Sequence, residues 1–107
     1  MPYIFVTGYY PTHKIPEVVK KWFESRKKFP PGEGPGEIVV DAASTANKDG
    51  IETVTITKVK QEELGEALSR TMSTMFLFQS IEGFEYSIMT YSSVEDALKS
   101  VGMKMPD

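Results

Sequence analysis

The segment from Ile15 to Lys28 constrains the fold of this chain most strongly, because it is patterned as an amphipathic helix with a defined beginning and end. Its apolar residues recur at helical spacing: Ile15, Val18, Val19, Trp22 and Phe23. Pro16 suits the first turn of a helix, and Pro30-Pro31 prevents the helix from continuing. One face of this helix must therefore pack against another layer of structure.

Strand patterns lie on both sides of this helix. Residues 3–9 are β-branched or aromatic and apolar on both faces, with Ile4 and Val6 on one face and Tyr3 and Phe5 on the other. Residues 38–46 and 53–57 predict two further strands joined by a turn at 47–50, whose Asp-Gly pair favours a hairpin. Residues 84–91 predict a fourth strand.

Two more helices complete the expected order. A second amphipathic helix opens at 61–63 and runs to about residue 76, and a short third helix is predicted from the capping-box spacing of Ser92 and Glu95 to Gly102. The order β-α-β-β-α-β with a terminal helix predicts a ferredoxin-like α+β fold, in which a four-stranded antiparallel sheet carries both long helices on one face. At 107 residues, we expect the whole chain, 1–107, to form a single domain.

The other face of this sheet is expected to be strongly apolar. We assign to it one apolar set from the first strand, the threonine row Thr53, Thr55 and Thr57, and part of the aromatic and methionine content of the fourth strand. Such a face is too apolar to remain in water, so we expect a homodimer in which a second copy packs sheet to sheet.

This element order and face chemistry resemble the dimeric α+β-barrel superfamily, which includes small monooxygenases and stress-response barrel proteins. The resemblance covers nearly the whole chain and implies a homodimer with a small cavity between sheet and helices. No catalytic motif of a member family is matched. Trp22 belongs to the apolar stripe of a helix and Asn47 to a hairpin turn, so neither is carried over as a site residue.

Composition excludes several classes of function. A net charge of −3 and a pI near 5.2 argue against a nucleic-acid partner. The absence of cysteine removes disulfides, thiol catalysis and cysteine-ligated metals, and we expect no cofactor and no metal site. The N-terminal apolar run is too short for a signal peptide and no stretch is long enough to span a membrane, so we expect a cytoplasmic protein with no membrane partner.

The candidate ligand-binding residues surround the expected cavity. The only histidine, His13, follows Tyr9 and Tyr10 in the connection between the first strand and the first helix, a position typical of binding loops. We expect these three side chains at the mouth of the cavity. Four others are expected to supply polar groups within it: Thr7, Asp41, Tyr86 and Tyr91. Asp41 interrupts an apolar strand, which favours an exposed edge or a paired charge.

The Gly/Pro-rich segment 30–37 is interpreted as a flexible connector, because Pro35 lacks a donor N–H, Glu33 repels anions, and the segment leads into a strand rather than a helix. Two hypotheses for function remain open. One is a homodimeric barrel-type protein that binds or transforms a small organic molecule. The alternative is a non-catalytic interaction or regulatory module with a filled interior, presenting the basic residues near Lys27 or the terminal helix to a partner protein.

Overall fold

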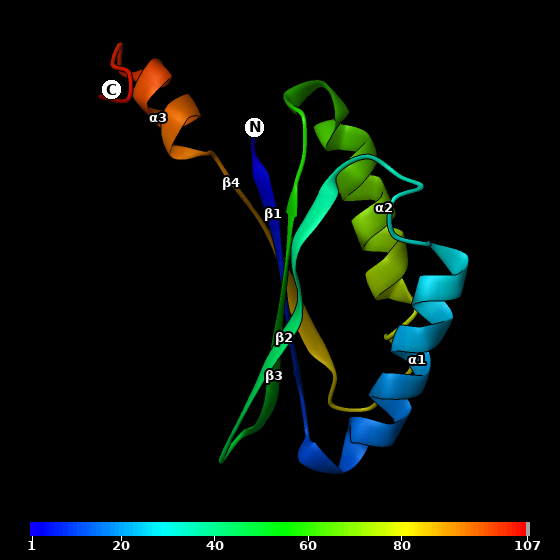
Figure 1. Cartoon of the computed structure of the whole chain (residues 1–107). Helices are drawn as coiled ribbons and strands as arrows, with labels where there is room; N and C mark the ends of the chain where they lie inside the picture. The colour runs from blue at the N-terminus through cyan, green and yellow to red at the C-terminus, as the bar shows by residue number, and fades with distance from the viewer. Residues whose placement is uncertain (107) are drawn as a thin grey trace.

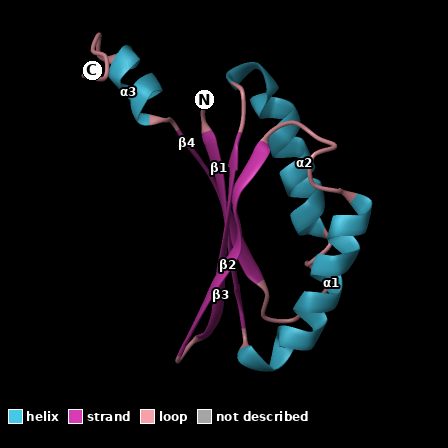
Figure 2. Ribbon diagram, viewed as in Figure 1, coloured by secondary structure: helices cyan, strands magenta, loops and turns pink. Residues whose placement is uncertain are grey.

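The computed structural model describes residues 1–106, which form one open antiparallel sheet with two long helices along one face (Figures 1 and 2). The elements are β1 (Tyr3–Tyr10), η1 (Thr12–Lys14), α1 (Ile15–Lys28), β2 (Glu37–Asn47), β3 (Gly50–Lys58), η2 (Gln61–Glu63), α2 (Leu64–Phe76), β4 (Glu85–Tyr91) and α3 (Val94–Ser100). The strands lie in the order β2-β3-β1-β4. The predicted ferredoxin-like α+β fold is confirmed.

The first helix begins and ends as its sequence predicts. The 3₁₀ turn η1 leads into α1, and Pro16 occupies the first turn. At the other end the backbone N–H of Phe29 donates to the carbonyl of Ser25 at 2.8 Å, and Pro30 follows. Because Pro30 lacks an N–H, the helix has no route to continue, and the chain turns back toward β2.

The third helix is capped one residue later than predicted. The N-cap is Ser93 rather than Ser92, and its hydroxyl accepts a 3.2 Å hydrogen bond from the backbone N–H of Asp96. Helix α3 stands beyond the end of β4, on the side of the sheet opposite to α1 and α2 (Figure 1). It is therefore not part of the helical layer.

The core consists of two small clusters at the two ends of the space between sheet and helices. One contains Tyr10, Val18, Phe78 and Ile81, and the other contains Ile4, Val59 and Ala67. Phe84 extends the first cluster by stacking on the ring of Phe78, with centroids 5.0 Å apart. These clusters fasten the helices to the sheet.

The threonine row of β3 faces the helices, which corrects the expectation that it lies on the open face. In the pairing of β1 with β3, Thr55 lies opposite Val6 and Ile56 lies opposite Phe5. Since side chains alternate along a strand, the inward turn of Thr55 places Val54 and Ile56 on the outer face. In this part of its length β3 thus presents hydroxyls to the helices and aliphatic side chains to the outside.

Candidate functional site

A cavity of about 610 Å³ lies between the sheet and the two long helices. Its apolar wall comes mainly from the helices. Helix α1 contributes Val19, Trp22 and Phe23, and α2 contributes Ala67 and Met75. Trp22 is the only tryptophan of the chain, so its fluorescence reports directly on this space.

Threonine hydroxyls from the sheet form the polar floor of the cavity. Thr53, Thr55 and Thr57 all line it. Thr55 Oγ1 accepts a 3.1 Å hydrogen bond from the backbone N–H of Ala42, where β2 bulges. Within residues 1–106 no hydrogen bond occupies the hydroxyls of Thr53 and Thr57, so these two are available to a bound molecule.

Of the two arginines on the cavity wall, Arg26 is neutralised. Its guanidinium makes two hydrogen bonds to the carboxylate of Asp41, one of them from Nη1 to Oδ2 at 3.0 Å, and its central carbon lies 4.8 Å from the centroid of the Trp22 ring. The ion pair connects α1 to the edge strand β2 across one side of the cavity. Asp41 is therefore both exposed at the sheet edge and paired with a cation. Each of these lowers the free-energy cost of placing a carboxylate in an apolar strand.

The other arginine, Arg70 on α2, has no carboxylate partner within residues 1–106. Its Nη2 donates to the carbonyl oxygen of Pro30 at 2.9 Å, and its guanidinium carbon lies 5.4 Å from the centroid of the Phe29 ring. These contacts hold the half-buried side chain in place and leave its positive charge uncompensated.

The Gly/Pro-rich segment forms part of the cavity wall beside this charge. Residues 30–32 and 34–36 all line the cavity. A Cβ atom at Gly34 would lie 2.5 Å from Nε of Arg70, so any other residue at this position would displace the Arg70 side chain. The sequence pattern indicated a connector, and its compositional signal gave no hint of this contact with α2.

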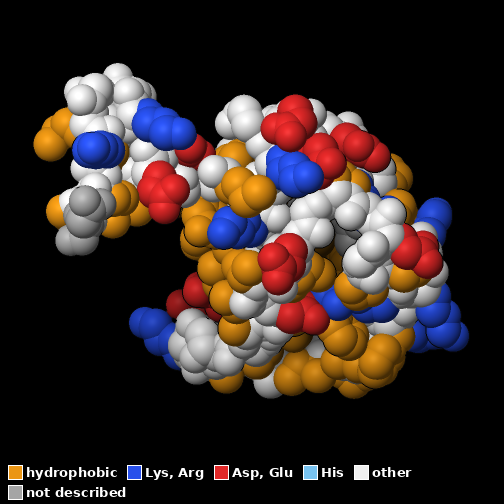
Figure 3. Space-filling view, turned by 45° about the horizontal axis from the view of Figure 1, so that its top comes forward, with side chains coloured by type: hydrophobic (Ala, Val, Ile, Leu, Met, Phe, Trp, Pro, Cys, Tyr) orange, Lys and Arg blue, Asp and Glu red, His pale blue; other side chains and the backbone are white. Residues whose placement is uncertain are grey.

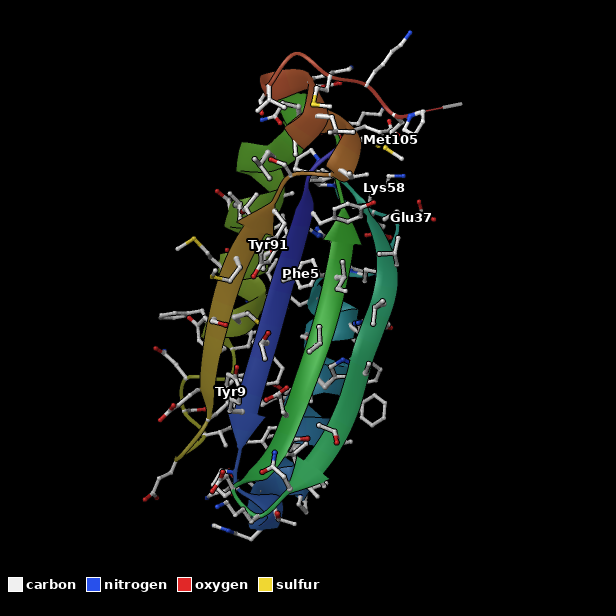
Figure 4. The ribbon with its side chains drawn as sticks, turned by 90° about the vertical axis from the view of Figure 1, so that its left-hand side faces the viewer. Phe5, Tyr9, Glu37, Lys58, Tyr91 and Met105 are labelled. Atoms are coloured by element: carbon white, nitrogen blue, oxygen red, sulfur yellow. The ribbon has the colours of Figure 1, made fainter. Side chains whose placement is uncertain are left out.

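Of the seven predicted site residues, only Tyr10 lines the cavity. Burial raises the pKa of its phenol. Three predicted residues project from the open face of the sheet instead: Thr7, Tyr9 and Tyr91 (Figure 4). Side chains alternate along each strand, and the pairing of β1 with β3 and with β4 places these three on the face away from the helices. The structure therefore separates the tyrosine pair Tyr9 and Tyr10 onto opposite faces.

The other three predicted residues lie outside the cavity lining. His13 is exposed on η1, and Asp41 pairs with Arg26 on the edge strand. Tyr86 is exposed on β4, where its ring centroid lies 6.3 Å from that of Phe84. Two features of the site were not predicted from the sequence: Arg70, which no sequence pattern singled out, and the threonine row of β3, which was expected on the outer face.

The open face of the sheet is the second notable surface (Figure 4). It is apolar through its centre, where the rings of Phe5 and Tyr91 meet edge to face with centroids 4.6 Å apart. Tyr9, Met89 and Tyr91 expose 43%, 49% and 46% of their surface, which is high for large apolar side chains gathered on one face.

Comparison with known proteins gave no match to any family model, curated protein or solved structure. Within residues 1–106, no helix combines the length and the apolar character that crossing a membrane requires. In the same residues no three histidine or carboxylate side chains lie close enough together to hold a metal ion.

Proposed function

We propose that this protein binds a small, mainly apolar organic molecule with one anionic group in the cavity between its sheet and helices, and that it works as a homodimer. The observation that carries the binding proposal is the uncompensated charge of Arg70 on the wall of a 610 Å³ apolar cavity. The resemblance to dimeric α+β-barrel proteins agrees with both parts.

The cavity has the size and composition of a ligand site. Pockets for small molecules are typically about 300–1,000 Å³, mostly apolar, with a few fixed polar groups. Here Trp22, Phe23 and Met75 supply the apolar wall, and the free hydroxyls of Thr53 and Thr57 supply hydrogen bonds. The interaction-module alternative requires a filled space between sheet and helices, and the cavity counts against it.

The charge of Arg70 selects the anionic group. A half-buried guanidinium with unused donors favours a carboxylate or sulfonate, which accepts two parallel hydrogen bonds. Arg26 does not serve this role, because Asp41 already occupies its donors. The ligand therefore places its anion near the loop at Gly34 and its apolar body along the helices.

The dimer part of the proposal rests on the open face of the sheet. Strands of about eight residues at a rise near 3.3 Å, in four rows about 4.8 Å apart, form a face of about 500 Å². A stable interface buries about 800 Å² per partner, so this face together with its surroundings supplies most of what a dimer needs. Phe5, Ile56 and Met89 then leave water.

The binding proposal is tested with two probes that share one apolar body. 8-Anilinonaphthalene-1-sulfonate carries a sulfonate, whereas N-phenyl-1-naphthylamine does not. Both are titrated into the protein while energy transfer from Trp22 is recorded. We expect both to quench Trp22 emission at 1:1 stoichiometry per chain, and the sulfonate probe to bind about tenfold or more tightly, because it alone reaches Arg70.

Two variants control this measurement. Arg70→Met keeps the length of the side chain but removes its charge, so it weakens the sulfonate probe and leaves the neutral probe unchanged. Thr71→Phe fills the cavity from α2, so it weakens both probes; binding at the open sheet face would be insensitive to it. Equal affinity of both probes for the wild-type protein would remove the anionic part of the proposal, and full binding to Thr71→Phe would remove the cavity.

A further inference from the structure

The charged residues on the open face lie at its two ends, and the two ends differ in charge. Going along the strands, one end row contains Tyr3 paired with Lys58, and the opposite end row contains Tyr9 paired with Glu52 and with Glu85. The rows between them are apolar or uncharged. One end therefore carries Lys58, next to Glu37 on β2, and the other carries two carboxylates without a cation in their row.

We propose that two copies pair through this face head to tail, with the two-fold axis running across the strands, so that Lys58 of each copy lies against the partner's Glu52. This inference rests on the dimer part of the proposed function and adds the arrangement of the two copies. A two-fold axis between two stacked sheets must lie in the plane of the interface, either along the strands or across them.

With the axis across the strands, each strand lies over the same strand of the partner and runs in the opposite direction. With the axis centred between the rows of Phe5 and Thr7, residue 58 at one end of β3 lies over residue 52 at the other end of the partner's β3. Two Lys–Glu pairs form by symmetry. The central rows, which contain Phe5, Ile56 and Val54, are buried between the sheets.

The axis along the strands gives a worse distribution of charge. It places the Glu52 and Glu85 end of one copy over the same end of the other, so that both glutamates of both copies gather without a cation in their rows. Like charges facing each other at an interface weaken association. The charge pattern of the face therefore distinguishes the two arrangements.

Helix α3 and the segment after it favour the same arrangement. They stand on the open-face side at the end that carries Lys58 and Glu37, and form a lobe set apart from the rest of the molecule (Figures 3 and 4). Four of their apolar residues are exposed among the described residues 1–106: Val94, Val101, Met103 and Met105.

In the head-to-tail dimer this lobe meets the opposite end of the partner's sheet, where Tyr9 is exposed beside Glu52 and Glu85. The lobe brings two exposed cations, Lys99 and Lys104, toward those carboxylates. Within residues 1–106 it has one unpaired carboxylate of its own, Glu95, since Asp96 is paired with the N-terminal amine of Met1. In the other arrangement both lobes would lie at the Lys58 end of the partner's sheet, away from Glu52 and Glu85.

Cross-linking tests the arrangement cleanly because the chain has no cysteine. The mass in solution is first measured by light scattering. Three variants are then oxidised under identical conditions: Lys58→Cys, Glu52→Cys and the double variant. We expect a covalent dimer from the double variant alone, since residues 52 and 58 are too far apart along one strand to join within a chain. Glu66→Cys, exposed on α2, is the negative control.

Each outcome decides between the proposals. A monomeric wild-type protein overturns the dimer and this arrangement with it. A dimer in which Lys58→Cys or Glu52→Cys cross-links alone keeps the dimer and overturns the head-to-tail pairing. A dimer in which the double variant stays uncross-linked places the interface elsewhere and also overturns the pairing.

Charge exchange gives an independent measurement. Lys58→Glu creates two repulsive pairs in the head-to-tail dimer, so we expect about tenfold or greater weakening in sedimentation equilibrium. Adding Glu52→Lys to the same chain restores opposite charges across the interface and recovers the affinity. With the axis along the strands neither change produces this pattern, because residue 58 then faces no carboxylate at position 52.

Discussion

Replacing Thr71 with phenylalanine tests whether the space between sheet and helices is a true cavity. Thr71 lies on α2, lines the cavity, and is half-buried, and its hydroxyl donates to the carbonyl of Ala67 at 2.8 Å. Because that hydroxyl is satisfied within its own helix, its loss leaves no orphaned partner on the sheet. Since Thr71, Val6 and the threonine floor line the same cavity, a phenylalanine ring at this position occupies part of that space.

The expected effect is a gain in stability. Threonine and phenylalanine have similar helix propensities, so the backbone contributes little to the difference. Burying the ring in an existing cavity contributes about 2 kcal/mol, within the range for a buried large apolar side chain. For a domain of 107 residues, that corresponds to a rise in Tm of about 8 °C or more.

The assay is urea unfolding followed by Trp22 fluorescence and by circular dichroism, with the midpoint compared at constant slope. Ser69→Phe is the matched control, because Ser69 is exposed on the same helix and does not line the cavity. It leaves the free energy of unfolding nearly unchanged. In a close-packed interior the added ring would instead cost about 1–3 kcal/mol. Destabilisation by Thr71→Phe with a neutral Ser69→Phe would therefore refute the cavity.

Three further outcomes follow from the packing. Ile4→Ala should destabilise the fold by about 2–5 kcal/mol in the same assay, since Ile4 is only 1% exposed; a loss below about 1 kcal/mol would contradict its role in the core. The raised pKa of Tyr10 favours its neutral form, so the related stability is present below about pH 10 and is lost as pH rises through the folded-state pKa. Tyr10→Phe should lessen the alkaline fall in unfolding free energy, whereas the exposed control Tyr9→Phe should not. Deleting residues 93–107 should weaken the dimer about tenfold or more in sedimentation equilibrium and leave binding of the sulfonate probe unchanged, and weakened probe binding would show that α3 supports the cavity.

The element order and most element bounds were predictable because they depend on local chemistry. The helix from Ile15 to Lys28 is set by an apolar stripe between prolines, and the hairpin by Asp49-Gly50. The cap of α3 differed by one residue because Ser92 and Ser93 both have a capping hydroxyl, and only the final turn geometry chooses between them.

The candidate site was much less predictable because it depends on which face of each strand turns inward. Alternation separates Thr55 from Ile56, but it does not say which of the two faces the helices. The usual rule is that the apolar face of a strand turns inward. For β3 this rule selects the wrong face, and it is no guide for a sheet whose two faces are both covered. Arg70 was missed for a related reason, since nothing local connects a residue of α2 with a loop 40 positions earlier.

The inverted polarity of β3 links the two parts of the proposed function. A strand that turns threonines toward its own helices gives up apolar burial there, which is reasonable when a ligand needs hydroxyls such as those of Thr53 and Thr57. The same inversion places Val54 and Ile56 on the outer face, where burial is recovered only if another surface covers them. The cavity and the proposed dimer thus both follow from the register of one strand. The variant Thr57→Val, which removes one of the two free hydroxyls and leaves the Ala42–Thr55 hydrogen bond in place, should weaken probe binding measured by Trp22 quenching and leave the mass in light scattering unchanged.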